Sequence, residues 1–437
     1  MIFRLKSFTS NKSKNSILAF TVFLLSAITL WLKARSEAIS PFDEMYHLSY
    51  IQYVFQGQIP RYGQALNSWS MNGFSCHPVF PFGNVTAVPC GEIGIPAQYP
   101  EGGTNSAQGW PPGYYAAAAA ILHLTSLFNI DPFYAARGVS VFLWSFGCAA
   151  LFLMQTKANI SRMVSFGVAI VVASLPLAMF HGAYTTPHST APLMVAIASW
   201  GVFKELNNLA PSPRKIWRVT LIPLCVLVVL PHALPVVLAS SLFFIIILFK
   251  SQRQASREAK ILESISLELV GIAVAASTIF GWAKIQQLRL IPYENGIESS
   301  AAQVANNPEF NLAQFFDTLL KFVPHAIDAY QFQSTSGIFI STIWSYIAMA
   351  VITFLIFQNS NKNHRIFGTC ILVSGIFYSF LAELFGPVAV PPRYGISIAI
   401  LVIVSTGLIA KDRIGRTIVI SVSWVTYGGC VLLSAFN

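Results

Sequence analysis

Long apolar runs alternate with short polar segments along most of the chain. Seven runs are almost free of charge and approach the roughly 17 to 25 residues that cross a bilayer as a helix. These runs are residues 16–32, 138–156, 163–180, 337–357, 366–382, 395–410 and 417–435. Four less regular candidates are residues 185–203, 219–230, 233–249 and 269–283. Because backbone polar groups in lipid must bond within their own segment, we expect every span to be helical. The pattern predicts an all-α polytopic membrane protein, a single transmembrane domain over 1–437 with about eleven spans.

One further segment is a candidate for a twelfth span. It is "GYYAAAAAILHLTSLF", residues 113–128. Counting it as a full crossing would turn Lys157 and Arg162 outward and would invert every later loop. We therefore expect this segment to lie at the outer membrane interface or to dip into it.

The distribution of charge sets the expected orientation. The chain has 437 residues, of which 54% are hydrophobic and 10% are charged, whereas soluble domains have about 25% charged residues. With the N-terminus inside and eleven spans, the inner segments hold 19 Lys and Arg against 5 Asp and Glu, and the outer segments hold 8 against 12. This is the positive-inside pattern. It accounts for the net charge of +10 and argues against a nucleic-acid partner.

The N-terminal segment "MIFRLKSFTSNKSKNS" has the basic character of a signal peptide, but "WLKARSEAIS" after the first apolar run has no convincing cleavage site. We expect a retained anchor. The chain is then a multi-pass protein with a cytoplasmic N-terminus, and we place it in a bacterial plasma membrane.

Two long connections are expected on the outer side, residues 33–137 and 284–336. Cys76 and Cys90 lie 14 positions apart in the first of them, in a stretch rich in Pro and Gly. In an oxidising compartment such a pair is expected to form a disulfide, the alternative being two free thiols.

The start of the first outer loop, "FDEMYHLSYIQYVFQGQIP", holds the main candidates for chemistry. Asp43 and Glu44 are neighbours, so on a helix they point about 100° apart and one is expected to support the other. Ionisable groups at membrane depth are functional by default. Alternatively, both are solvated residues that favour the start of a helix. His47 is four residues after Asp43, a spacing that suits an acid/base pair or a divalent metal, and both possibilities stay open.

Other candidates lie in short corners on the same side. "GWPPGYY", residues 109–115, is a rigid start to a helix that carries Tyr114. "PPRYG", residues 391–395, places Arg393 and Tyr394 at the outer mouth of a span, and a guanidinium there suits a phosphate. Snorkelling to the headgroups is the alternative for Arg393. Weaker phosphate candidates are Lys284 and Arg289.

Taken in order, the anchor, "FDEMYHLSYIQYVFQGQIP", "WPPGYYAAAAAIL", "AARGVSVFLW" and "PPRYG" resemble the GT-C superfamily. This superfamily comprises polytopic glycosyltransferases with lipid-phosphate sugar donors, including protein O-mannosyltransferases and bacterial aminoarabinose transferases. The resemblance spans the architecture of the whole chain, and its specific residues lie at positions 41–140 and 391–395.

The resemblance implies a role for each of these residues. Asp43 is the base on an acceptor hydroxyl, Glu44 or His47 assists it, and Arg393 holds the phosphate of a polyprenyl-phosphate sugar donor. The acceptor is a glycan, lipid or protein. The second acidic residue that many relatives carry is missing, and the corresponding corner "YTTPHSTAP" has His188 instead. No cofactor is required by the pattern, although a divalent metal stays open.

Two other classes of function remain as alternatives. A transporter or lipid flippase is favoured only by the proline-broken "VVLPHALPVVL", since ionisable residues are rare within the spans. A non-catalytic assembly protein with binding loops is the other alternative.

Overall fold

The computed structural model describes most of the chain, including nearly all of the first long loop. The described residues are 2–41, 43–206, 233–252, 281–291, 312, 315, 335–358, 361–384 and 395–436. Within them the regular structure is helical, and β structure is limited to isolated bridges. The expected all-α class is confirmed for this part of the chain.

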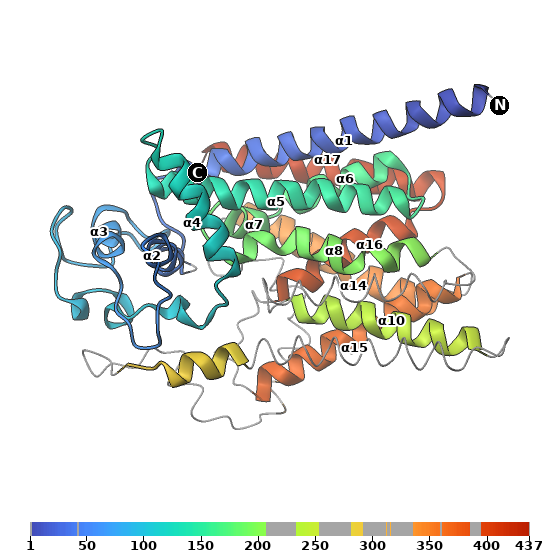
Figure 1. Cartoon of the computed structure of the whole chain (residues 1–437). Coiled ribbons are helices and arrows are strands. Elements are labelled where there is room, and N and C mark those ends of the chain that lie inside the picture. The colour runs from blue at the N-terminus through green and yellow to red at the C-terminus, as the bar shows by residue number, and fades with distance from the viewer. Residues whose placement is uncertain are drawn as a thin grey trace.

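Most of the described helices run side by side as one bundle (Figure 1). They are α1 (Ile2–Ala34), α5 (Pro132–Lys157), α6 (Arg162–Ser174), α8 (Ala191–Glu205), α10 (Leu234–Gln252), α14 (Thr335–Phe357), α15 (Lys362–Leu384), α16 (Ile396–Ile409) and α17 (Arg413–Phe436). Three segments are long and apolar enough to cross a membrane: Ser13–Ala34, Pro132–Lys157 and Arg413–Leu432. The protein is therefore a helical membrane protein, and the total of eleven spans stays a prediction.

Two predicted spans are interrupted in the structure. The run 163–180 divides into α6 and the short α7 (Pro176–His181), with a break at Leu175. Proline favours the first turn of a helix and disfavours helical backbone in the residue before it, which explains the break. The run 185–203 begins with the 3-10 turn η4 (Pro187–Thr190) before α8. The predicted span 219–230 and most of 269–283 lie outside the described residues.

The core of the bundle consists of large buried side chains and close helix contacts. Trp144 on α5 is fully buried, and its indole N–H donates to the carbonyl oxygen of Val172 on α6 at 3.2 Å. A Cβ at Gly147 would lie 2.4 Å from the backbone nitrogen of Leu193. Because Gly147 has no side chain, α5 and α8 can approach each other closely. Small residues have the same effect in other pairs of membrane helices.

A second folded unit, which we call the head (residues 36–131), lies at one end of the bundle (Figure 1). It contains α2 (Glu44–Phe55), α3 (Ser68–Cys76), the short 3-10 helices η1 (Pro96–Gln98), η2 (Pro100–Gly103) and η3 (Ser106–Gly109), and α4 (Gly113–Ser126). Its apolar cluster is distinct from that of the bundle, but it extends onto the first turns of α5 through Phe133, Ala136 and Val139. The head is therefore a folded part of the predicted loop 33–137, and it shares its core with the start of α5.

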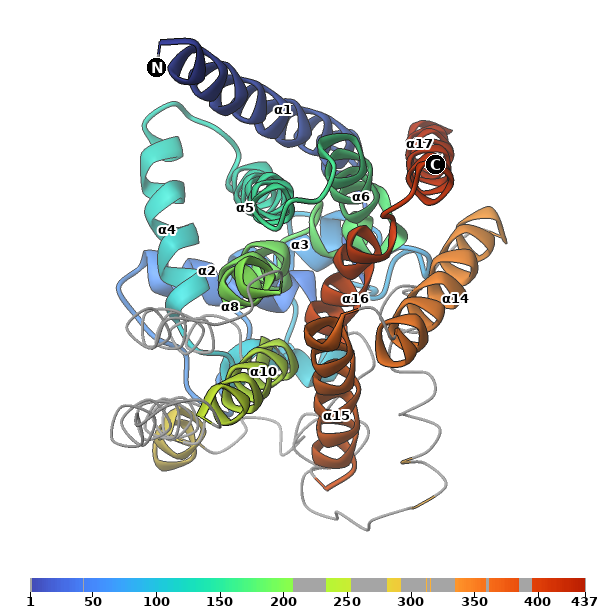
Figure 2. The same ribbon diagram turned by 90° about the vertical axis from the view of Figure 1, so that its right-hand side faces the viewer.

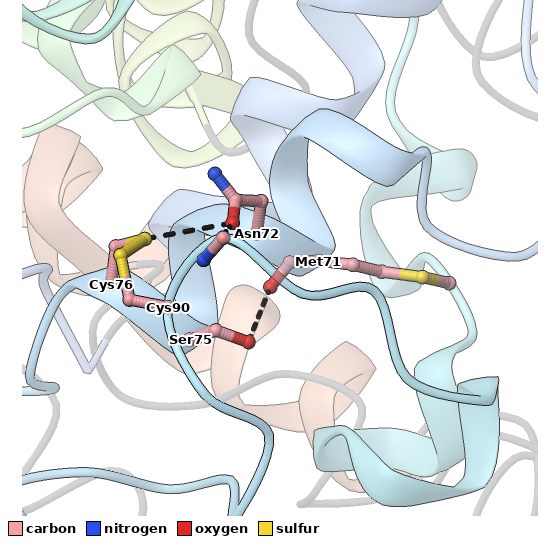
Figure 3. Close-up of a disulfide and its surroundings, with 6 residues drawn as sticks. Met71, Asn72, Ser75, Cys76 and Cys90 are labelled. Carbon is pink, nitrogen blue, oxygen red and sulfur yellow. Dashed lines mark hydrogen bonds between the residues drawn. A yellow bond between two sulfur atoms is a disulfide. The ribbon is translucent and has the colours of Figure 1, made fainter.

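A disulfide joins Cys76 at the end of α3 to Cys90 in the following loop (Figure 3). The side-chain oxygen of Asn72 accepts from the backbone N–H of Gly91 at 2.9 Å and holds the same loop against α3. Cys76 and Cys90 are thus bonded to each other, and the disulfide predicted from their spacing is confirmed.

Helix α4 is the segment considered as a twelfth span. It has 14 residues and runs across the direction of the bundle helices at the head end in both views (Figures 1 and 2). Ile121, Leu124, Leu127 and Phe128, on the helix and just after it, are exposed. A short helix that crosses the bundle axes and exposes apolar side chains is typical of a membrane interface.

Candidate functional site

Asp43 is held in an unusual backbone conformation between α1 and α2. It occupies the N-cap position of α2 with φ 63° and ψ 16°, in the left-handed region. Asp and Asn tolerate this region better than most residues, and strained backbone clusters at functional sites. The Asp43 carboxylate makes no capping hydrogen bond to α2. Helix capping therefore does not explain the presence of this residue.

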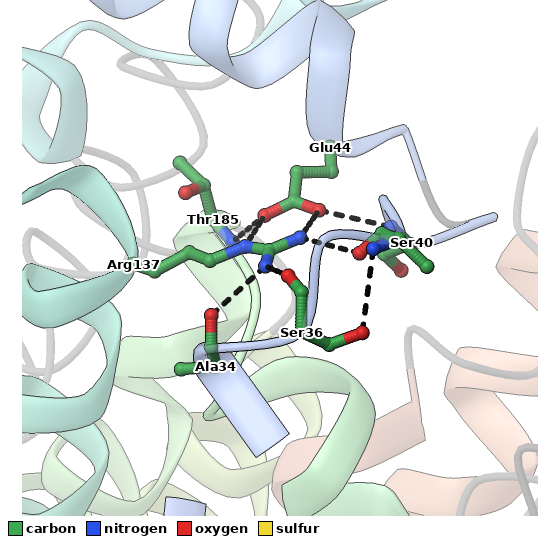
Figure 4. A network of polar contacts seen from close by, with 7 residues as sticks. Ala34, Ser36, Ser40, Glu44, Arg137 and Thr185 are labelled. Atoms are coloured by element: carbon green, nitrogen blue, oxygen red, sulfur yellow. Dashed lines mark hydrogen bonds and ion pairs between the residues drawn. The ribbon is translucent and has the colours of Figure 1, made fainter. Parts of the chain in front are cut away.

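Glu44 is buried and its two carboxylate oxygens accept four hydrogen bonds (Figure 4). Oε1 accepts from Nε of Arg137 at 2.8 Å and from the backbone N–H of Thr185 at 3.0 Å. Oε2 accepts from Nη2 of Arg137 at 2.7 Å and from the backbone N–H of Ser40 at 2.9 Å. Glu44 is therefore not the solvated residue that one sequence alternative describes.

Arg137, in the second turn of α5, completes this network. Its five N–H groups all find acceptors: two oxygens of Glu44, and the backbone carbonyl oxygens of Ala34, Ser36 and Ala38. The guanidinium carbon also lies 4.0 Å from the ring centre of Phe133 and 4.7 Å from that of Tyr184. A buried ion pair is stable only when its remaining donors and acceptors are satisfied, as they are here. The pair ties the end of α1 and the start of α2 to the bundle.

A pocket of about 210 Å³ lies on the head side of Asp43. Its polar lining residues are Ser40, Asp43, Glu44, Tyr46 and Glu101. Burial raises the pKa of Tyr46 well above its usual value, and the negative charges of Asp43 and Glu101 raise it further. Glu101 has left-handed backbone as well, with φ 54°. Three acidic residues, Asp43, Glu44 and Glu101, therefore line one pocket, with a neutral phenol beside them, and two of the three have left-handed backbone.

His47 and His188 come together through Trp110. Nδ1 of the buried His47 lies 2.8 Å from the hydroxyl oxygen of Tyr115. The ring centre of Trp110 lies 6.0 Å from that of His47 and 5.1 Å from that of His188, and both contacts are edge-on. Among the described parts of the chain, neither histidine lines the Asp43 pocket. They form a buried aromatic row that connects α2 to the corner before α8.

The remaining predicted residues lie elsewhere. Tyr114 is buried, its hydroxyl lies 3.0 Å from Oγ of Ser140, and burial raises its pKa to about 12. Arg289 donates from Nη2 to the carbonyl oxygen of Ile59 at 2.8 Å, and Lys284 is exposed. None of the three lines the Asp43 pocket. Arg393 and Tyr394 lie outside the described residues.

The described ranges contain no group of three or more His, Cys, Asp or Glu side chains placed to hold a metal ion. Sequence reasoning missed Arg137 and Glu101. Arg137 had a usable signal, since a charged residue at the start of an apolar run is expected to have a buried partner. Glu101 had none, because it is a lone acid in an irregular segment.

Comparison of the sequence with protein-family models and with curated proteins finds no match. Functional assignment therefore depends on the geometry around Asp43 and Glu44.

Proposed function

We propose that this protein is a membrane glycosyltransferase of the GT-C type, with a polyprenyl-phosphate sugar as donor and Asp43 as general base. The observation that supports it most is the position of Asp43. Asp43 lines a pocket, on strained backbone, next to a buried ion pair that anchors it to the end of a helical bundle.

The chemistry requires a proton acceptor at headgroup depth. The acceptor hydroxyl gives its proton to Asp43, its oxygen attacks the anomeric carbon, and the bond from that carbon to the phosphate oxygen breaks with its electron pair leaving on the phosphate. General-base catalysis of this kind contributes about 10²- to 10⁴-fold. The donor carries its own isoprenoid anchor, so the reaction belongs beside the membrane, where the α1–α2 connection lies.

Glu44 has a different role from Asp43 in this proposal. Its oxygens are occupied by Arg137, Ser40 and Thr185. It positions the first residues of α2, and with them the backbone of Asp43. Arg393 remains the proposed partner of the donor phosphate, together with Arg289 and Lys284 as weaker candidates.

The positions of charge favour a transferase over a transporter. Charged residues of the three segments long enough to span are Lys14, Lys33, Arg137, Lys157, Arg413 and Arg416. All of them lie within two turns of an end of their segment. Transporters place ionisable groups near the middle of the bilayer, where the substrate and coupling ions bind.

The test compares Asp43→Asn with Glu37→Gln. Asn also tolerates left-handed backbone, so this substitution removes the base and retains the fold. Glu37 is an exposed carboxylate in the same connection and serves as the matched control. Membranes containing each variant are supplied with polyprenyl phosphate that carries a radiolabelled hexose or pentose, and label transferred to delipidated cell envelope is counted. We expect a loss of at least about 100-fold for Asp43→Asn only. Equal transfer by both variants would exclude Asp43 as base.

A further inference from the structure

Tyr46, in the first turn of α2, has no role so far in the transfer reaction. Its side chain is 6% exposed and lines the pocket of Asp43. Asp43 is the N-cap and Tyr46 the third residue of α2, and side chains at these two positions are neighbours at the start of a helix. The ring of Tyr46 packs edge-on against that of Phe74, which lines the same pocket, with 5.7 Å between the ring centres. The phenol is therefore held in one orientation beside Asp43.

The hydroxyl group of Tyr46 makes no hydrogen bond to the residues that the structure describes. Buried tyrosine hydroxyls usually have a hydrogen-bond partner. The hydroxyl of Tyr184 shows the enclosed case, since its oxygen has no accessible surface and no partner within the described ranges. The oxygen of Tyr46 does not belong to these enclosed atoms. Because Tyr46 lines the pocket, its hydroxyl is placed to bond a group that enters there.

The charge of the wall decides which group the phenol meets. Asp43, Glu44 and Glu101 line the pocket, and its described lining includes no Lys, Arg or His. Burial, and then the charges of Asp43 and Glu101, hold the pKa of Tyr46 well above its usual value, so the phenol keeps its proton and donates. Asp43 and Glu101 would repel a phosphate or another anion. The pocket therefore favours an uncharged ligand with hydroxyl groups.

The rest of the wall indicates the size and shape of that ligand. Phe74, Val79 and Val85 give the pocket an apolar side. Its volume of about 210 Å³ is below the roughly 300 to 1,000 Å³ of pockets that hold drug-sized molecules. A single sugar residue has hydroxyl groups at its edge and C–H groups on its faces, so it matches a small pocket with one polar and one apolar side.

We propose that this pocket is the acceptor subsite, that the acceptor is an uncharged sugar residue, and that Tyr46 donates a hydrogen bond to one of its oxygens. A neighbouring hydroxyl of the same residue gives its proton to Asp43, and Tyr46 holds that hydroxyl in place. The donor phosphate lies outside the pocket. This inference rests on the proposed transfer function, and it narrows the acceptor from a glycan, lipid or protein to a sugar residue.

Binding of uncharged sugars to the purified full-length protein tests the pocket without any transfer. The probes are the methyl glycosides of glucose, galactose, mannose and N-acetylglucosamine, and the measurement is the thermal unfolding midpoint at increasing probe concentration. A ligand that binds only the folded state raises this midpoint. We expect at least one glycoside to raise it, and the 6-phosphate of the same sugar to have no effect. Tyr46→Phe should weaken the affinity about two- to tenfold, because one hydrogen bond between uncharged groups is lost.

Tyr134→Phe is the matched control. Tyr134 is a half-buried tyrosine at the start of α5 that does not line the pocket. Its substitution should leave the affinity for the glycoside unchanged. Without ligand, both variants should unfold at the midpoint of the unmodified protein, because neither loses a hydrogen bond to a described residue. A purely structural role of Tyr46 would instead lower its midpoint.

The transfer assay separates this inference from the proposed function. Delipidated envelope from cells that lack the protein is the acceptor, and the amounts of envelope and of labelled lipid donor are varied in turn. Tyr46→Phe should raise the half-saturating amount of envelope about two- to tenfold and leave that of the donor unchanged.

Two results would overturn the inference and leave the proposed function in place. One is loss of transfer in Asp43→Asn with normal saturation by envelope in Tyr46→Phe. The other is a rise in the half-saturating amount of donor, which would place Tyr46 at the donor. Glycoside binding that depends on Tyr46, without transfer by the unmodified protein, would retain the sugar pocket and overturn the transferase. Absence of both glycoside binding and transfer would overturn both proposals.

Discussion

At the scale of single residues, Glu44 and Arg137 lie side by side with neither side chain exposed. Taking two charges out of water is costly, and their attraction offsets the cost only when the other hydrogen-bonding groups are satisfied. All five donors of Arg137 and both oxygens of Glu44 have partners in three separate segments of the chain. Removal of either side chain would leave several buried polar groups without partners.

We therefore expect Glu44→Gln to destabilise the protein by about 3 to 5 kcal/mol, because it leaves the Arg137 charge buried and uncompensated. The measurement is thermal unfolding of the purified protein in detergent. Glu92→Gln, at an exposed position of the head, is the matched control and should leave the midpoint unchanged. A Glu44→Gln midpoint equal to that of the control would show that the pair does not hold α2 to the bundle.

At the scale of elements, α4 is the last helix of the head before α5 of the bundle, and it exposes apolar side chains. Tyr114 and Tyr115 are buried at its start, whereas Leu124 and Phe128 at and beyond its end are 58% and 75% exposed. A buried start and an apolar exposed end favour contact with lipid over contact with water.

Spin-label accessibility tests this position of α4. In a chain whose four cysteines outside the disulfide are replaced, Leu124→Cys and Ile95→Cys are labelled with a nitroxide in lipid vesicles. Ile95 is 66% exposed in the head and serves as the control. We expect position 124 to be more accessible to oxygen than to a water-soluble nickel chelate, because oxygen partitions into lipid, and position 95 to show the reverse. Similar water accessibility at both positions would contradict an interfacial α4.

At the scale of the whole molecule, the two ends of the bundle differ in chemistry. The head, with the disulfide and the Asp43 pocket, occupies one end (Figure 1). Lys411, Arg416 and His364 meet at the other. Basic residues remain on the cytoplasmic side of membrane proteins, and disulfides form in oxidising compartments. Both tendencies favour a head outside the cytoplasm.

Labelling of intact cells with a membrane-impermeant maleimide tests this orientation. In the same cysteine-replaced chain, Glu37→Cys should react in intact cells, and Arg413→Cys should react only after the membrane is permeabilised. The opposite result would invert the topology and would place Asp43 in the cytoplasm, away from the expected site of lipid-linked transfer.

Local sequence was sufficient for the helical class and for most helix positions. Apolar run length depends only on neighbouring residues, and the runs near α1, α5, α14, α15, α16 and α17 match described helices. The break at Leu175, before Pro176, is also a local effect, although run length alone predicts one continuous span there. The pairing of Cys76 with Cys90 needed only a short separation in a stretch without other cysteines.

The roles within the acidic motif depended on residues far away in the sequence. Asp43 and Glu44 are neighbours with similar chemistry, and sequence analysis could say only that one supports the other. The fold brings Arg137 and Thr185, 93 and 141 positions away, to Glu44, and it brings Glu101 to the pocket of Asp43. Composition and periodicity describe how each segment meets lipid or water, whereas the partner of a buried charge is set by which distant segments pack together.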